Sequence, residues 1–462
     1  MSTIRRKKTE NDLGTGEIRG LVLKLAVPAM LAQLVNVLYS IVDRIYIGNI
    51  PYEGARALAG LGVCGPVVTM MSAFAAWIGV GGAPLVSISL GQKDEKKAEQ
   101  ILANAFMMLL VMSGLIMVLG YLFKDILLMK FGATEEIFPF AQAYMSIYLL
   151  GTVFSILSLG LNQYIICQGF ARQGMLSVVI GAAFNIILDP LFIFTFGMGV
   201  QGAAAATVIS QLASCCFTLM ILFGRRIPVR ISFAGYDFAV CRRILILGFT
   251  PFMIILFDNV LIIVQNVMLK MYGGNNKDLL LTCNTIVQSF MLIVTMPLSG
   301  ITGGTQAILG YNYGAGNKTR VRKAEAEIIK TGIVFCTLMF LFARFGAKYF
   351  VMLFTRDLYY MAKTVGFIKI YTLGIIPLAV QYAVVDAFTA MGIARAALPL
   401  SFFRKGIYIA LVVFLSMSLG AEFLFWAEPV SDVISPIVSV CTFAVVFPKL
   451  FSNQHLGESG EL

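Results

Sequence analysis

Four aspartates stand inside long apolar stretches of this chain, where a carboxylate has no water to hydrate it: Asp43, Asp189, Asp258 and Asp386. A charged group at the centre of a membrane helix costs at least about 2.5–3.5 kcal/mol on insertion scales. An acid in such a place is therefore a candidate for function. The chemistry open to it is the binding of a proton or a small cation.

Asp43 and Asp189 are predicted to lie at one depth in a membrane. Asp43 lies five residues before the end of its apolar stretch, Asp189 eight before the end of its own, and Thr207 five after the start of the next. At a rise of about 1.5 Å per residue, all three fall roughly 8–12 Å below the same boundary. Asn185 precedes Asp189 by one helical turn and shares its face.

Two carboxyls, an amide and a hydroxyl would thus converge in one place. Their oxygens suit Na⁺, and two carboxyls crowded away from water also favour holding a proton between them. We therefore predict a Na⁺ or H⁺ site at these four residues. Two alternatives remain open: Asp43 pairs with the adjacent Arg44 at the interface, or Asp189 and Pro190 cap a helix kink.

Asp258 and Asp386 are predicted to form a second site, for a cation or for substrate, facing a central cavity. Asp258 lies seven residues after Pro251, near the middle of its stretch, and Asp386 about two turns before Arg395. The alternatives are an internal salt bridge, or exposure of Asp386 at the inner surface.

The composition sets the class of protein that must position these acids. Of 462 residues, 59% are hydrophobic and 13% are charged, against about 45–50% and about 25% in soluble domains. Apolar runs of roughly 20 residues are long enough to cross about 30 Å of hydrocarbon as helices. We predict an all-α integral membrane protein of twelve transmembrane helices. The expected spans are residues 20–48, 55–88, 98–123, 138–168, 173–196, 200–224, 240–272, 279–308, 322–346, 358–391, 396–419 and 422–448.

Basic residues gather in every second connection between these spans, as with Lys93, Arg172, Arg225, Lys318 and Arg395. The positive-inside rule then places both termini in the cytoplasm. The net charge of +11 is in this view a topology signal. No nucleic-acid partner is expected.

The chain also repeats itself at one constant offset of 223 residues. Pro28 falls on Pro251, Asn36 on Asn259, Gly91 on Gly314, Gly169 on Gly392 and Arg172 on Arg395. Each half holds six spans, which predicts two six-helix bundles related by a pseudo-two-fold axis. The expected parts are an N-terminal tail (1–19), an N-lobe (20–224), a linker (225–239), a C-lobe (240–448) and a C-terminal tail (449–462), both tails being cytoplasmic.

Enzyme and metal signatures are missing from the sequence. The eight cysteines form no CxxC pair, and the single histidine, His455, lies in the polar tail, so neither a zinc site nor a disulfide framework is expected. The glycine-rich stretch 310–319 does not fit the phosphate-loop pattern. We predict no enzyme and no cofactor, with H⁺ or Na⁺ as the coupling ion.

Four motifs resemble the multidrug and toxic compound extrusion (MATE) family of transporters. They are Val27-Pro28 with Asp43 fifteen residues later, Gln168-Gly169 with Arg172, Asn185 to Pro190, and Gly202 to Thr207. The resemblance covers roughly residues 20–450 and is greatest to the DinF-type branch.

The resemblance implies the MATE fold, a Na⁺/H⁺ site at Asp43, Asn185, Asp189 and Thr207, and a span that bends at Pro28. Asp258 and Asp386 match cation-site acids of the NorM-type branch. It further implies a monomeric, multi-pass antiporter embedded in the lipid bilayer of the bacterial cytoplasmic membrane, which exports organic cations or drug-like amphiphiles against H⁺ or Na⁺.

The alternative within the same superfamily is a flippase for lipid-linked precursors. It would need cationic cavity residues, for which Arg44 and Arg404 are the candidates. A membrane enzyme or receptor scaffold is a different class, and the twofold repeat speaks against it.

Overall fold

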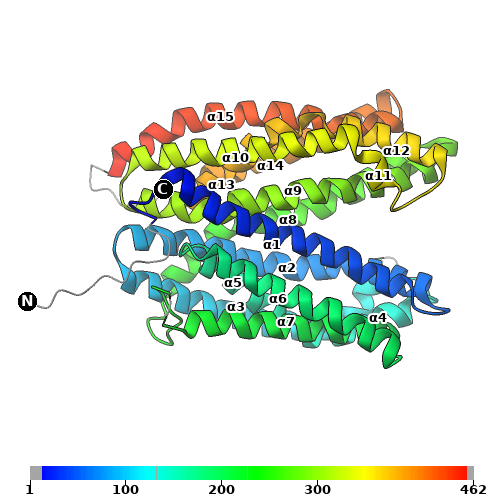
Figure 1. Ribbon diagram of the computed structural model, residues 1–462, viewed down its shortest axis with the longest axis horizontal. Coiled ribbons are helices and arrows are strands. Elements are labelled where there is room, and N and C mark those ends of the chain that lie inside the picture. Colours follow the sequence, from blue (N-terminus) through cyan, green and yellow to red (C-terminus); the bar gives the residue numbers. More distant parts are fainter. Residues whose placement is uncertain (1–12, 132, 226, 455–462) are drawn as a thin grey trace, which may run out of the picture.

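The computed structural model describes residues 13–131, 133–225 and 227–454, and every regular element in this part of the chain is a helix. Figure 1 shows two stacked layers of long, nearly parallel helices, with the first half of the chain in one and the second half in the other. The long apolar runs dictate this outcome, because only helices satisfy their backbone hydrogen bonds within one segment in lipid.

The first layer is built from seven α-helices and one five-residue π-helix. They are α1 (Ile18–Gly48), α2 (Gly54–Gly91), α3 (Glu95–Lys130), α4 (Phe138–Leu150), α5 (Thr152–Ile166), α6 (Ala171–Pro190), the π-helix η1 (Leu191–Thr195) and α7 (Gly199–Phe223).

The second layer contains eight α-helices and three short 3₁₀ segments. They are α8 (Phe238–Tyr272), η2 (Gly274–Asn276), α9 (Lys277–Gly314), α10 (Lys318–Phe345), α11 (Ala347–Val351), α12 (Leu358–Tyr371), η3 (Thr372–Gly374), α13 (Ile375–Ala390), α14 (Ala394–Ser418), η4 (Ala421–Trp426) and α15 (Ala427–Gln454).

Eleven helical segments of the described chain are long and apolar enough to cross a membrane, and α4 with α5 makes a twelfth that is bent by 58°. The predicted all-α fold of twelve spans is confirmed. The bend was not predicted. At the break, a Cβ on Gly151 would lie 2.5 Å from a methyl carbon of Val208, so the bent span approaches α7 closely at a residue without a side chain.

The repeat predicted at offset 223 is visible in the turns that precede α3 and α10, which have the same backbone geometry and the same helix cap. Asp94 caps α3 by accepting a hydrogen bond from the Lys97 N–H, and Asn317 caps α10 in the same way from the Arg320 N–H. The residue before each cap, Lys93 or Gly316, has a positive φ of 63° or 70°. Because side-chain caps and left-handed residues depend on the sequence at single positions, the two halves have kept the same turn between equivalent helices.

The two layers meet through α1 against α9, and through α2 against α8 and α9. We call the end of the molecule where α1 begins the near end, and the end where α1 stops the far end. In the near half of the molecule the backbones touch: a Cβ on Gly91 would lie 2.0 Å from the Tyr311 carbonyl oxygen, and one on Gly248 would lie 1.7 Å from that of Trp77.

The face of α2 that carries Gly91 and Trp77 is exposed toward the far end. Pro84 is buried in the near half of the helix, whereas Ala59, Gly62 and Met70, which continue this face, are exposed. No atom lies within 4 Å of a Cβ built on Gly62. The lobes are therefore in contact at the near end and apart at the far end.

The segment before α1 lies across this near-end contact. The Arg320 guanidinium donates to the carbonyl oxygens of Leu13 (3.2 Å) and Gly16 (2.8 Å), and Asn312 donates to that of Leu13 (2.9 Å). The Leu13 side chain is buried and faces Gly169 of the other layer. Residues 13–16 thus contact both lobes.

Candidate functional site

The four residues predicted as a cation site come together in the N-lobe. Asn185 Nδ2 lies 3.2 Å from Asp189 Oδ1 and 3.5 Å from Thr207 Oγ1. The Asp43 carboxyl of α1 lies within hydrogen-bonding reach of the Asp189 carboxyl. Asp43 is 8% exposed and Asp189 is 0% exposed. The four side chains thus lie together in the structure, while their role as a cation site stays a prediction.

Asp189 stands where α6 changes its winding. Pro190 follows it and provides no N–H, and the chain continues as the π-helix η1 instead of a regular α-helix. A Cβ on Gly202 of α7 would lie 2.8 Å from the Phe192 backbone, so α7 packs directly on this wide turn. The helix irregularity proposed as an alternative role for Asp189 thus exists beside the cluster and helps to form it.

Several oxygens of this cluster are buried without a hydrogen-bond donor among the described residues: Asp43 Oδ1, Asp189 Oδ2 and Asn185 Oδ1. Buried polar atoms are normally satisfied, so an unsatisfied group of oxygens indicates a missing partner. A proton or a cation that prefers oxygen ligands fits this donor set.

Tyrosines surround the cluster, and two of them were missed by the sequence analysis. Tyr144 lies near Thr207 and stacks on Tyr148 with ring centroids 5.9 Å apart. The Tyr148 hydroxyl accepts from Gln211 Nε2 at 3.3 Å. The two tyrosines are four residues apart on one helix, which was the available signal.

Arg44, the alternative partner for Asp43, is exposed. The ion pairs within the described part of the chain do not include one between these two residues. The side chain of Asp43 is buried and that of Arg44 is exposed, so the two residues are neighbours in sequence without forming an ion pair.

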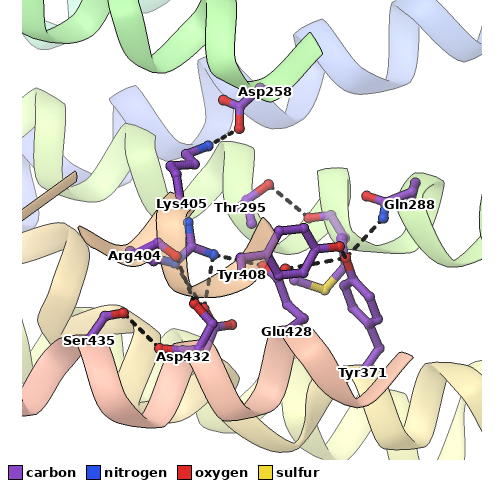
Figure 2. A network of polar contacts seen from close by, with 12 residues as sticks. Asp258, Gln288, Thr295, Tyr371, Arg404, Lys405, Tyr408, Glu428, Asp432 and Ser435 are labelled. Carbon is purple, nitrogen blue, oxygen red and sulfur yellow. Dashed lines mark hydrogen bonds and ion pairs between the residues drawn. The ribbon is translucent and has the colours of Figure 1, made fainter. Parts of the chain in front are cut away.

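In the C-lobe, Asp258 of α8 forms an ion pair with Lys405 of α14 (Figure 2). The Lys405 side chain is 10% exposed and that of Asp258 is 51% exposed. The internal salt bridge considered as an alternative for Asp258 is therefore present.

A wider set of contacts continues from Lys405 to α15. Arg404 Nη2 lies 2.7 Å from Glu428 Oε1 and 2.9 Å from Asp432 Oδ1. The Tyr371 hydroxyl donates to Glu428 Oε2 at 3.3 Å and lies 3.1 Å from the Tyr408 hydroxyl. We call this set the C-lobe network, and Figure 2 shows it reaching from α8 to α15. Its members are Asp258, Gln265, Gln288, Tyr371, Arg404, Lys405, Tyr408, Glu428 and Asp432.

Lys405, Glu428 and Asp432 were not predicted from the sequence, although each is a charged residue within an apolar span, as Asp258 is. Glu428 and Asp432 are four residues apart, which places them on one face of α15.

Asp386 lies elsewhere. Its carboxyl lies near the side chains of Thr302 and Gln306 of α9, and its charged neighbour is Glu325 of α10. Glu325 is 3% exposed, and neither of its carboxyl oxygens has a hydrogen-bond partner among the described residues.

The structure does not bring Asp386 and Asp258 into one site. Asp386 is four residues from the near end of α13, and Asp258 is twenty residues from the near end of α8. At about 1.5 Å per residue these distances are roughly 6 Å and roughly 30 Å. The two acids therefore differ in depth and have separate partners.

These features define a class: a multi-pass membrane protein of two similar helical lobes, with a cluster of buried carboxyl, amide and hydroxyl groups in the first lobe. The model of the MatE family matches residues 28–191 and 247–415, so the chain belongs to the MatE family of membrane transporters. Membership confirms the predicted family and the prediction that the protein is not an enzyme.

Individual relatives agree with this assignment. The multidrug export protein MepA of Staphylococcus haemolyticus (strain JCSC1435) is 24% identical over 430 residues, covering 92% of each chain. A solved outward-facing conformation of a multidrug resistance MATE family transporter aligns with a TM-score of 0.88 at 22% identity, over 95% of this chain and 98% of the other. A crystal structure of MATE in the bent conformation aligns with a TM-score of 0.87 at 22% identity, over 95% and 97%. The predicted fold is thereby confirmed.

Proposed function

We propose that the protein is a secondary active exporter of organic cations and amphiphilic drugs, driven by antiport of H⁺ or Na⁺. The observation that carries the proposal is the buried pair of Asp43 and Asp189. One carboxyl oxygen of each, Asp43 Oδ1 and Asp189 Oδ2, has no hydrogen-bond donor among the described residues. An ion taken up there changes the charge of the N-lobe next to the seam between the lobes. The drug-export role of the relative MepA supports the class of substrate.

The near end is proposed to be the cytoplasmic end, so that both tails lie inside the cell and the far end opens outward. The protein is expected to act as a monomer in a bacterial cytoplasmic membrane, with residues 20–224 and 240–448 as its lobes. In the described conformation the lobes touch at the near end only, which corresponds to an outward-facing state of an alternating-access cycle.

Pro28 is proposed as the hinge of α1. It lies inside the helix and removes one backbone hydrogen bond. Its neighbour Ala29 contacts Gly300 and Gly304 of α9 in the other lobe. A bend at this position connects ion binding at Asp43, farther along α1, with the contact that closes the near end.

The cycle then follows from charge. The coupling ion enters from the far end, binds at Asp43 and Asp189, and favours release of a cationic substrate outward. Return of the lobes to the opposite state exposes the acids to the near end, where the ion leaves and substrate binds. Asn185 and Thr207 provide neutral oxygen ligands, which hold the ion without adding charge.

A lipid-linked precursor flippase is not favoured by the contacts. A pyrophosphate group requires free cations in the chamber, whereas Arg404 is neutralised by Glu428 and Asp432, and Lys405 by Asp258. Arg44 lies directly beside the carboxyl of Asp43 in the sequence.

Uptake of ethidium into inverted vesicles, or its efflux from right-side-out vesicles, under imposed pH or Na⁺ gradients tests the proposal. Wild type is expected to export ethidium under at least one gradient, and Asp43→Asn and Asp189→Asn are expected to lose at least about tenfold of that rate, since a barrier change of about 1.4 kcal/mol is tenfold. Arg44→Gln is the control. Normal gradient-driven export by both Asn variants, or export that needs ATP after both gradients have collapsed, would refute it.

A further inference from the structure

Two stripes of α8 are exposed, and their chemistry differs. One stripe is Asp258, Ile262 and Asn266, spaced four residues apart so that they share a face. The other holds only apolar side chains, namely Val260, Ile263, Val267 and Met271. An apolar stripe suits lipid, whereas an exposed carboxylate and amide require water. The stripe of Asp258 therefore borders the water-accessible space between the lobes.

Lys405 reaches Asp258 from inside the C-lobe. Its stem lies among Met253, Phe257 and Phe402, and its ammonium meets the carboxylate at the edge of that space (Figure 2). One side of Asp258 is thus occupied by a cation that belongs to the protein, while the other side is open. A cationic ligand that entered between the lobes would have to compete with Lys405 for this carboxylate.

The ammonium also has a second set of acids within electrostatic reach. Glu428 and Asp432 both interact with Lys405. They share a single guanidinium, that of Arg404. Asp432 is 0% exposed, and its Oδ2 has no donor among the described residues. The interior of the network therefore has an acceptor to spare for a displaced ammonium.

We propose that Lys405 is a tethered counter-ion that stands in for substrate at Asp258, and that a monovalent organic cation binds by displacing it toward Asp432. The inference rests on the proposed function and adds a residue that sets substrate specificity. Cations that give up their hydration easily, such as delocalised aromatic ones, compete best with a strongly hydrated ammonium. A neutral amphiphile gains nothing from the exchange.

Ethidium binding to the purified protein in nanodiscs, followed by fluorescence, tests this inference. Lys405→Met keeps the apolar stem and removes the charge. It is expected to bind ethidium about fivefold more tightly, because ethidium no longer has to break the partly exposed ion pair between Lys405 and Asp258. The factor corresponds to the stabilisation that such a pair provides. Asp258→Asn is expected to weaken binding, and the double variant is expected to match Asp258→Asn. The matched control Lys363→Met removes the ion pair to Glu422 in the same lobe and is expected to bind like wild type.

Asp432→Asn provides a separate measurement, in case Lys405→Met is poorly folded by size-exclusion chromatography. It removes the inner acceptor, so Lys405 stays on Asp258 and ethidium binds more weakly. Unchanged binding in Lys405→Met, or a gain that persists without Asp258, overturns the inference.

The two proposals fail separately. If wild type exports no organic cation but Lys405→Met binds ethidium and wild type does not, the counter-ion stands and the export function falls. If wild type exports ethidium and neither Lys405→Met nor Asp432→Asn alters its binding, export stands and the counter-ion falls.

Discussion

The two lobes place polar clusters at equivalent positions and fill them differently. At the offset of 223, Tyr148 corresponds to Tyr371 and Asn185 to Tyr408, and all four belong to the clusters described. In the N-lobe, the paired acids form no ion pair with a cationic side chain of the described residues. In the C-lobe, Arg404 and Lys405 pair with the acids. Duplication kept the helices and changed the charge pairing, which is why we propose that the N-lobe is the one that takes its cation from solution.

The sharpest way to break this comparison is to remove the built-in cation. Arg404→Gln leaves Glu428 and Asp432 buried without their partner, which is expected to cost about 3–5 kcal/mol of stability. The exposed Arg44→Gln is expected to cost less than about 0.5 kcal/mol. Thermal unfolding of the detergent-solubilised variants measures both. Equal stability of the two would mean that the C-lobe acids do not depend on Arg404.

The next test asks which lobe binds an ion from solution. Replacing K⁺ by Na⁺ at constant ionic strength, or else acidifying the buffer, is expected to stabilise wild type by about 1.4 kcal/mol when the ion is at about ten times its Kd. Asp189→Asn should abolish this stabilisation by the ion, because the Asp189 side chain can no longer carry a negative charge. The matched C-lobe variant Asp432→Asn should retain it. Stabilisation that disappears in Asp432→Asn and persists in Asp189→Asn would reverse the roles of the lobes.

The smallest expected difference concerns the equivalent tyrosines. Tyr371→Phe removes a hydroxyl that contacts Glu428, Tyr408 and Gln288, and is expected to cost about 1–3 kcal/mol because one of these groups is charged. Tyr148→Phe loses the hydrogen bond from Gln211, at about 1 kcal/mol. Unfolding curves of the pair, recorded under the same conditions, decide between them. A larger loss in Tyr148→Phe would contradict the picture of a dense C-lobe network.

The sequence predicted what depends on position along one helix. Twelve spans follow from apolar length, and the meeting of Asp43, Asn185 and Asp189 follows from depth and one helical turn. An internal salt bridge was considered for Asp258, but its partner Lys405 could not be predicted. The register of α14 against α8 depends on side-chain packing between residues far apart in the chain.

Other errors have equally specific causes. Asp386 and Asp258 were grouped by charge alone, while α8 and α13 run in opposite directions and place them at different depths. The 58° bend between α4 and α5 depends on the close approach of Gly151 to Val208, a tertiary contact that hydropathy does not report.

The hydrogen bonds from Arg320 and Asn312 to residues 13–16 have a consequence for biogenesis. The contact between Asn312 and Leu13 joins residues 299 positions apart. Residues 13–16 leave the ribosome before Asn312 and Arg320 do, and therefore have no partners there until the hairpin of α9 and α10 has been synthesised and inserted. Contacts of such long range form slowly, so sealing of the near end is expected to be among the last steps of assembly.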